Sequence, residues 1–342
     1  MPKGKFEPSW TARWFTCAVV AVVAGAATAI RGATPPLGER IIDNLYSTQF
    51  VSANEGWTVG SFGSIFHTGD GGETWRPQAS TTYEQLFGVS FADAHNGWIV
   101  GRTGLILHTA NGGEKWERQK NTNEKHLFSV SAVDAQHVWA VGDWGVMLAS
   151  SDGGQTWQDR SLDRDVILYA QSWPDSQHGW TVGEMGTVLV TSDGGQTWQD
   201  QASGTEKTLF SIHFADLKRG WACGLDGIIL HSEDGGATWK AQRGNTEVGA
   251  LEQIGVAEAM ENASLYDITV VGNIGYAVGD IGSLFLSTDG GVTWARQEIP
   301  RDSKLGWIRS VSLVSGTHGM FVGANGLMIR IAADNVEVSG RK

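Results

Sequence analysis

The sequence is poor in cysteine and in positive charge, and each shortage excludes a class of protein. Its 342 residues include two cysteines, and its 25 lysines and arginines stand against 37 acidic residues, for a formal net charge of −12. An acidic surface repels a phosphate backbone, so nucleic acid is excluded as the main partner. Removal of a leader that contains Cys17 would leave Cys223 alone, so we expect no disulfide and a buried, hydrophobic role for Cys223.

The beginning of the chain lacks an apolar run of ordinary membrane-spanning length. Lys3, Lys5 and Arg13 precede an apolar stretch of 16 residues, Phe15 to Ile30, that ends in small residues. A bilayer span needs roughly 20 residues, whereas a basic start, a shorter apolar run and a small-residue exit are typical of an export signal. We therefore predict that residues 1–30 are a signal peptide or, alternatively, an uncleaved membrane anchor. In both cases the rest of the chain is exported.

Glycine and tryptophan, by contrast, are abundant, and most tryptophans belong to a repeat. The motif Asp-Gly-Gly-x-Thr-Trp, or a close variant of it, occurs six times. Its closing tryptophans stand 41 residues apart four times and 55 apart once; they are Trp75, Trp116, Trp157, Trp198, Trp239 and Trp294. A repeat of about 40 residues is typical of a circular or solenoid array rather than of one compact core.

A second motif, Val-Gly-x-x-Gly followed by a short apolar run, occurs seven times in step with the first. Its copies begin at Val59, Val100, Val141, Val182, Cys223, Val278 and Val322. Short alternating runs and Asp-Gly or Asn-Gly turns indicate strands joined by hairpins. We therefore predict an all-β fold, a seven-bladed β-propeller of four-stranded antiparallel blades over residues 45–338. Residues 31–44 are expected to be a linker or closure segment, and an insertion at about 244–264 precedes the sixth blade.

The acidic position of each hairpin has a structural explanation. A carboxylate or amide oxygen there can accept backbone N–H bonds within the turn. The six residues are Asp70, Asn111, Asp152, Asp193, Asp234 and Asp289. Because the amide of Asn111 still offers an acceptor, the pattern favours a structural role over a catalytic one.

The first strand of each unit is expected to run along the central channel. One of its faces carries an aromatic residue in six units, at Tyr46, Phe87, Phe128, Tyr169, Phe210 and Tyr266, and Arg309 in the seventh. The opposite face carries mainly serine, glycine or alanine, which suit a crowded axis. We therefore expect a channel walled mostly by serine and glycine. His213 and Asp267 are expected to be solvated wall residues.

The seventh unit has no hairpin motif of its own, so two segments compete for its fourth strand. One is Val336 to Val338, and the other is the segment around Thr34 to Ile42. We favour the amino-terminal segment, because closing the ring with the first segment would lock the last blade.

Places where the repeat is broken are the candidates for partner binding. Large residues stand at the tips of the Gly-x-x-Gly loops, where core packing does not explain them: Phe62, Arg102, Trp144, Met185 and Ile281. Arg164 in a linker and Arg309 are candidate contacts for a carboxylate or a chain terminus. Within the insertion, Ala250 to Met260 has the apolar spacing of a short amphipathic helix, which is either a packed decoration or a contact.

The hairpin motif, Ser/Thr-x-Asp-x-Gly-x-Thr-Trp, is the Asp-box, also called the bacterial neuraminidase repeat. Together with Gly-Trp-x-Val-Gly-x-x-Gly over residues 45–332, it resembles the photosystem II stability/assembly factor family. The resemblance implies an exported, non-catalytic propeller of the periplasm or thylakoid lumen that holds a membrane protein, such as a new photosystem II subunit. Similar propellers associate with envelope transporters, so an accessory subunit of an RND-type transporter is the alternative. The leader lacks the lipoprotein motif of the cyanobacterial pattern.

Sialidases share the Asp-box, so an enzyme is a third hypothesis. Their chemistry needs an arginine triad, a Tyr–Glu pair and an aspartic acid at the channel mouth, and glycoside hydrolysis in general needs paired carboxylates. The sequence supports neither grouping. The histidines fall on equivalent positions of different blades, which lie too far apart for a metal cluster. We expect no enzymatic activity, no metal and no cofactor.

Overall fold

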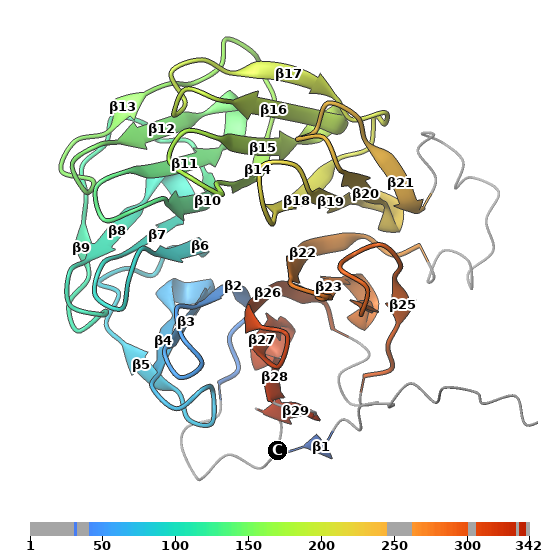
Figure 1. Cartoon of the computed structure of the whole chain (residues 1–342). Coiled ribbons are helices and arrows are strands. Elements are labelled where there is room, and N and C mark those ends of the chain that lie inside the picture. The colour runs from blue at the N-terminus through green and yellow to red at the C-terminus, as the bar shows by residue number, and fades with distance from the viewer. Residues whose placement is uncertain (1–30, 33–40, 245–261, 300–305, 333–334, 340–342) are drawn as a thin grey trace, which may run out of the picture.

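The computed structural model describes residues 31–32, 41–244, 262–299, 306–332 and 335–339. Seven sheets stand around a central axis, and the four antiparallel strands of each blade follow the sequence from the axis outward (Figure 1). This arrangement confirms the predicted seven-bladed propeller. In the described part of the chain, no helix has the length and apolar character needed to cross a bilayer. The predicted leader and most of the predicted insertion lie outside the described residues.

Each blade contributes four strands. The innermost strands are β2 (Leu45–Phe50), β6 (Leu86–Phe91), β10 (Leu127–Ala132), β14 (Leu168–Ser172), β18 (Leu209–Phe214), β22 (Leu265–Val271) and β26 (Ile308–Ser315). The second strands are β3 (Gly56–Gly60), β7 (Gly97–Gly101), β11 (Val138–Gly142), β15 (Gly179–Gly183), β19 (Gly220–Gly224), β23 (Ile274–Gly279) and β27 (His318–Gly323).

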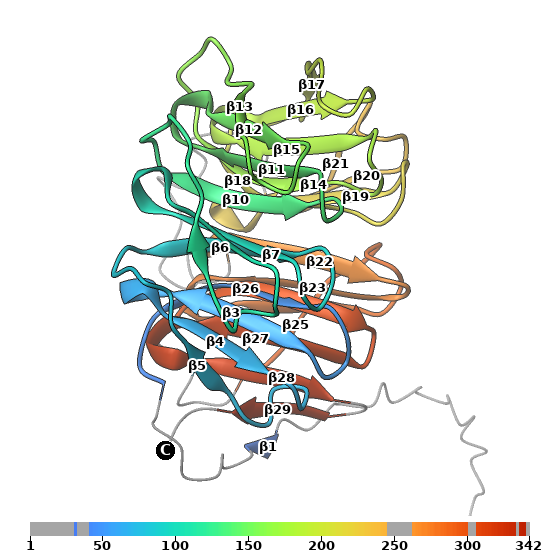
Figure 2. The ribbon, with the colours of Figure 1, turned by 90° about the vertical axis from the view of Figure 1, so that its left-hand side faces the viewer.

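The third strands are β4 (Ile65–Thr68), β8 (Ile106–Thr109), β12 (Met147–Ser150), β16 (Thr187–Thr191), β20 (Ile229–Ser232), β24 (Leu284–Ser287) and β28 (Met328–Ala332). The outermost are β5 (Arg76–Gln78), β9 (Glu117–Arg118), β13 (Gln158–Asp159), β17 (Gln199–Ala202), β21 (Lys240–Arg243), β25 (Ala295–Arg296) and β29 (Asn335–Ser339). Short 3-10 turns join the second and third strands: η1 (Ser61–Gly63), η2 (Arg102–Gly104), η3 (Asp143–Gly145), η4 (Glu184–Gly186), η5 (Leu225–Gly227), η7 (Asp280–Gly282) and η9 (Ala324–Gly326). Figure 2 shows the blades from the side.

The Asp-box residues act as turn acceptors, as predicted. In the first box the hydroxyl of Thr68 donates to the Asp70 carboxylate at 2.8 Å, and the backbone N–H and the hydroxyl of Thr74 donate to it at 2.8 and 2.6 Å. Gly72, with φ of +86°, donates its N–H to the Thr68 hydroxyl at 2.9 Å. Asn111 accepts two of the three hydrogen bonds, because its amide oxygen binds the Thr109 hydroxyl and the Lys115 N–H, and lysine has no hydroxyl to supply the third.

The tryptophans connect neighbouring blades. The indole N–H of the Asp-box Trp116 donates to Gln78 on the preceding blade at 3.1 Å, and Trp157 and Gln119 repeat the contact. The Gly-Trp residue of an earlier blade reaches forward instead, as Trp57 does to the Gly112 carbonyl at 3.2 Å. Where both contacts are made, as between the first and second blades, they link the tryptophan of one blade to the hairpin of the next.

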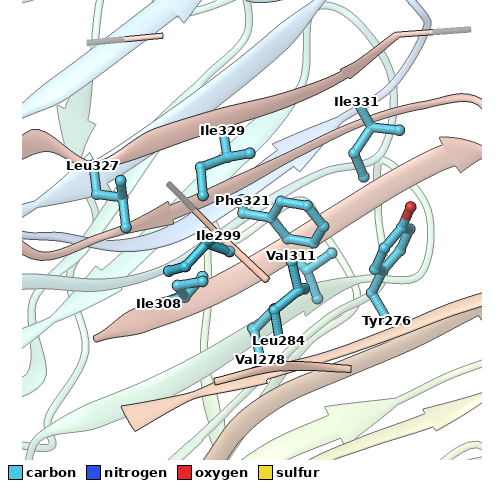
Figure 3. Packing of buried hydrophobic residues seen from close by; sticks show 10 residues of the cluster. All are labelled: Tyr276, Val278, Leu284, Ile299, Ile308, Val311, Phe321, Leu327, Ile329 and Ile331. Atoms are coloured by element: carbon cyan, nitrogen blue, oxygen red, sulfur yellow. The ribbon is translucent and has the colours of Figure 1, made fainter. Parts of the chain in front are cut away.

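Seven hydrophobic clusters fill the spaces between blades. Each combines residues of two adjacent blades, including the pair formed by the seventh and the first, where Leu45 and Phe50 meet Met320 and Val322. Figure 3 shows the cluster between blades six and seven, in which Phe321 packs against Tyr276 and Val311. Because both faces of every sheet are covered, all five residues of strands such as β7 are buried.

The fourth strand of the last blade corrects one expectation. β29 pairs antiparallel with β28, with Ala332 opposite Asn335, so the carboxyl-terminal segment takes the place for which we favoured the amino-terminal one. Two residues separate β28 from β29, and so short a connection makes a hairpin entropically cheap. The amino-terminal β1 (Arg31–Gly32) pairs in parallel outside β29 as a fifth strand.

Replacement of an Asp-box acceptor tests its structural role. Asp70→Ala leaves three donors around Thr68 and Thr74 without their acceptor, and is expected to lower the free energy of unfolding by about 1–3 kcal/mol. Asp70→Asn is the matched control, because Asn111 shows that an amide oxygen is accepted in this position. Urea unfolding measures both. Equal losses for the two variants would contradict the role of the acceptor oxygen.

Acid sensitivity follows from the same hydrogen bonds. The Thr197 hydroxyl and N–H lower the pKa of Asp193 from 3.8 to about 2, and the corresponding bonds from Thr293 lower that of Asp289 to about 2. Because these pKa values lie below those of the unfolded chain, their stabilisation is complete above pH 4 to 5 and lost as pH falls towards 2. The urea concentration at the midpoint of unfolding should be constant from pH 7 to pH 5 and should decrease once the pH is lower than 4. A midpoint unchanged at pH 2.5 would refute this.

Candidate functional site

The two ends of the propeller are built from different turns. One end, here called the linker face, carries the blade-to-blade linkers and the 3-10 turns. The first N–H of each turn binds the carbonyl that precedes the innermost strand of the same blade, as Arg102 does with Gln85 at 3.0 Å. The other end, here called the Asp-box face, carries the hairpins, where the Gly112 N–H binds the His95 carbonyl at 3.0 Å.

Exposed apolar side chains are concentrated on the linker face. Of the large hydrophobic residues that are exposed in the described ranges, Leu217 and Val292 lie on the Asp-box face. The others all lie on the linker face: Ile42, Phe62, Tyr83, Trp144, Met185, Leu225 and Ile281. Such concentration on one face is typical of an interaction surface.

The loop tips hold apolar residues at a cost in backbone energy. The middle residue of each 3-10 turn has a positive φ, between 52° and 58°. Asp226 and Asn325 tolerate that conformation well, but Trp144, Met185 and the β-branched Ile281 do not. Since Met185 is 79% and Trp144 57% exposed, burial does not offset the strain. Strain that brings no packing gain is a feature of functional positions.

The structure places four of the five predicted tip residues at the tips and corrects the fifth. Phe62, Trp144, Met185 and Ile281 occupy the positive-φ position. Arg102 stands one residue earlier, and Thr103 is the tip of that blade, with φ of 54°. Arg102 is still exposed on the linker face. The sequence did not show which of the two residues between the glycines, Arg102 or Thr103, would take the positive-φ position.

Arg164 and Met185 meet at one open groove on the linker face. The guanidinium of Arg164 pairs with the Asp200 carboxylate at 2.9 Å, and both line a depression of about 860 Å³ together with Met185 and Glu206. On the neighbouring blade, the Lys125 ammonium lies 4.6 Å from the centre of the Trp144 ring. A cation over an indole forms an amphipathic contact point at the surface.

The mouth of the axial channel on this face is lined by a collar of aromatic rings. Neighbouring rings lie between 5.2 and 5.9 Å apart from centre to centre, around Tyr46, Phe87, Phe128, Tyr169, Phe210 and Tyr266. Trp307 stacks on Tyr46 at 5.8 Å, and Arg309 lies over Tyr266 at 4.6 Å, so the collar closes at the seventh blade. The six rings of the innermost strands, Arg309 and the small residues beside them enclose a cavity of about 290 Å³.

The collar overturns the expectation of a wall made mostly of serine and glycine. Alternation along the innermost strands separates two faces, but both faces reach the axis near the strand ends, because the sheets stand edge-on to the channel. Serines do line the wall, together with Gln49, Gln171 and His213, in a second cavity of about 360 Å³ towards the Asp-box face. The sequence analysis did not identify Trp307 as part of the channel mouth. The feature that could have indicated it is that this tryptophan lies outside both repeat motifs.

Asp267 is also different from the expected solvated wall residue. Its carboxylate accepts four hydrogen bonds: from the Ser211 hydroxyl at 2.7 Å and the Ile268 N–H at 2.9 Å, and from the Ser310 hydroxyl at 3.0 Å and the Val311 N–H at 2.8 Å. Burial raises its pKa. Asp267 therefore connects blades five, six and seven. His213 likewise binds the Val270 carbonyl through its ring nitrogen at 2.8 Å.

The chemistry available in the channel suits binding. Within the described ranges, no group of three histidine, cysteine or acidic residues is placed to hold a metal ion. Cys223 is buried, as expected, and burial raises the pKa of its thiol well above the ordinary value, so little thiolate is available. Arg309 remains the cationic group at the mouth.

Fold and channel together define the class of protein: a seven-bladed Asp-box β-propeller with a collared axial channel and an apolar linker face. The sequence model for the photosynthesis system II assembly factor YCF48 matches residues 38–125 and 161–248, just over half of the chain. The chain therefore belongs to the YCF48 family. No curated protein matches the sequence.

Solved structures of similar fold include members of this family and enzymes. A structure of YCF48 bound to a D1 peptide shares 21% identity and a TM-score of 0.69, over 89% of this chain and 100% of that one. YCF48 from Cyanidioschyzon merolae shares 22% identity and a TM-score of 0.66, over 87% and 97%. A GH74 xyloglucanase from Xanthomonas campestris shares 12% identity and a TM-score of 0.72, over 88% and 55%. Identities this low establish the fold alone.

The strain at the tips is open to a direct test. The variant Met185→Asn replaces a methionine that is 79% exposed and held at positive φ. Asparagine tolerates this conformation, as Asn325 shows at the equivalent position of the last blade. The variant is expected to gain about 1 kcal/mol in the free energy of unfolding. Asparagine substituted for exposed Val292, outside the positive-φ positions, is the control and should give no gain. Chemical denaturation measures both, and a destabilised Met185→Asn would contradict the strain.

Proposed function

We propose that this chain is an exported, non-catalytic propeller that holds a segment of a membrane-protein partner on its linker face. The observation that carries the proposal is the set of apolar tips, Phe62, Trp144, Met185 and Ile281, which are exposed on one face and held at positive φ. Membership of the YCF48 family supports it, because a family member of the same fold has been described with a D1 peptide bound.

A photosystem II subunit is the partner that the family favours. The acidic pI of about 5.2 makes a polyanionic partner unfavourable. The seven sheets and their three-residue 3-10 turns offer a preformed surface for an extended segment. Residues such as Trp144 and Met185 would be anchors on this surface, since large apolar side chains dominate binding energies. Export to the periplasm or thylakoid lumen rests on the composition of residues 1–30.

Arg102 and Arg164 extend the same surface. Arg102 is exposed beside the tip of the second blade, and Arg164 is held by Asp200 at the groove that ends at Met185. Both therefore lie where a segment crossing the apolar tips would pass. An arginine can bind a carboxylate through two parallel hydrogen bonds, so acidic side chains of the partner would be aligned here.

Loss of the apolar anchors should release the partner. The double variant Trp144→Ser, Met185→Ser is expected to lower recovery of a membrane-protein partner from detergent-solubilised membranes at least tenfold, by quantitative mass spectrometry. The reason is that two side chains 57% and 79% exposed in the free protein would be buried in the complex.

The matched control is Leu217→Ser, Val292→Ser on the Asp-box face, where the side chains are 44% and 56% exposed. It should recover the partner like the unaltered protein. Full recovery by the linker-face variant would show that this face is not the docking surface. Hydrolysis of sialosides or xyloglucan that a single substitution abolishes would overturn the non-catalytic assignment.

A further inference from the structure

Arg309 is a charged group whose hydrogen-bonding capacity is unused. Its guanidinium lies 4.6 Å from the centre of the Tyr266 ring, and it lines the collar cavity. The N–H groups have no acceptor among the described residues. A guanidinium offers five donors and no acceptor. Arg309 is half-buried, and a partly buried charge without hydrogen-bonding partners is costly. The position therefore calls for an acceptor that the protein does not supply.

The nearest carboxylate cannot fill that need. A carboxylate has about four lone-pair sites, and at Asp267 all four are taken by Ser211, Ile268, Ser310 and Val311. Two of these donors are backbone N–H groups, which are fixed by the strands. The negative charge of Asp267 attracts Arg309, but the carboxylate oxygens of Asp267 already accept hydrogen bonds that connect the blades. They are therefore not available to the guanidinium.

The repeat shows that arginine is not needed to build the collar. In each of the six other blades this position holds phenylalanine or tyrosine, and adjacent rings pack at 5.2 to 5.9 Å. An aromatic residue in the seventh blade would complete the ring without burying a charge. Arginine at this one position thus costs stability, as the tips do, and a ligand would offset that cost.

We propose that Arg309 and the aromatic collar form a binding site for a single carboxylate group at the mouth of the axial channel. A planar carboxylate matches the guanidinium fork with two parallel hydrogen bonds. The surrounding rings keep water from the pair, which strengthens charge-assisted bonds. The cavity of about 290 Å³ lies just below the roughly 300–1,000 Å³ range of small-molecule sites. It therefore fits a chain end, a side chain or a small organic acid, not a large cofactor.

Acidic residues at the rim restrict the ligand further. Asp143, Glu184 and Asp280 open 3-10 turns whose first N–H groups bind the carbonyls that precede β10, β14 and β22, at the mouth of the channel. Their charges contribute to the raised pKa values of Tyr169 and Tyr266, which are due first to burial. Negative charge at the rim disfavours a ligand with two or more negative charges. The site should therefore prefer a monocarboxylate to phosphate, and above all a carboxylate with a basic group beside it.

The test uses the whole exported chain and thermal unfolding. Sodium acetate, at ionic strength matched with chloride, should raise the melting temperature saturably, because a ligand that binds the folded state stabilises it. Arg309→Phe, which installs the residue of the other blades, should fold, melt at or above the unaltered protein without acetate, and lose the acetate effect. Arg118→Gln, at an exposed arginine on β9, is the control and should respond like the unaltered protein.

Peptides then identify the source of the carboxylate. Acetyl-Gly-Ala-Lys-Ala with a free carboxyl end should bind at least tenfold tighter than its amide by calorimetry, and Arg309→Phe should remove the difference. Acetate should compete with the peptide, because both would bind Arg309 through a carboxylate, and peptide that binds without such competition would contradict the shared site. Should Arg309→Phe fail to fold, Arg309→Gln replaces it in each comparison.

Three results would overturn the proposal: no response of the unaltered protein to acetate or peptide, the same response in Arg309→Phe, or tighter binding of phosphate than of acetate. None of these measurements involves the membrane-protein partner. Their outcome is therefore independent of the outcome for Trp144 and Met185.

Discussion

The propeller depends on how the free edges of its innermost strands are satisfied. The innermost strand of a blade pairs on one side with the second strand, so alternate N–H groups on its other side need acceptors. Side chains of the preceding blade supply them: Ser47 accepts from the Val89 N–H at 3.3 Å, and Ser90 from that of Ala132 at 3.0 Å. The same bond closes the ring, where Ser312 accepts from the Phe50 N–H at 2.9 Å. Serine at the axis is thus a connector between sheets.

This constraint separates the residues that build the ring from those left for recognition. The acidic acceptors of the Asp-boxes are occupied by hydrogen bonds within their hairpins. Among the Asp-box tryptophans, Trp116, Trp157 and Trp294 donate to the preceding blade, and the others are occupied by packing. Asp267 performs the connecting role of serine with a carboxylate, between blades six and seven. The residues left for recognition are Arg309 in the collar and the apolar tips of the linker face. At both places other blades carry a residue that suits the position better: an aromatic ring in the collar, and aspartate or asparagine at the tips.

Much of the architecture was predictable because it repeats. The 41-residue spacing of the tryptophans indicated the repeat, the seven copies of Val-Gly-x-x-Gly indicated the number of blades, and the Asp-box acceptors were recognised from turn chemistry alone. The errors lie where periodicity carries no information. Alternation in β2 does not tell which residues reach the axis of a ring of edge-on sheets, so the aromatic collar was not foreseen. Arg102 was misplaced by one residue because the positive φ of Thr103 follows from the fold and not from its side chain. The outer position of β1 is a tertiary contact between distant segments, which local patterns do not encode.

The pairing of β1 with β29 has a mechanical consequence. Arg31 and Gly32 form the outermost strand of the last blade, whereas the bonds that close the ring, from Thr48 and Phe50 to Ser310 and Ser312, lie at its axis. A pull on the beginning of the chain therefore loads a two-residue strand first, and that strand can detach by local opening. Tension from a tether at that end would open this outer layer before any load reached β2 and the bonds at the axis.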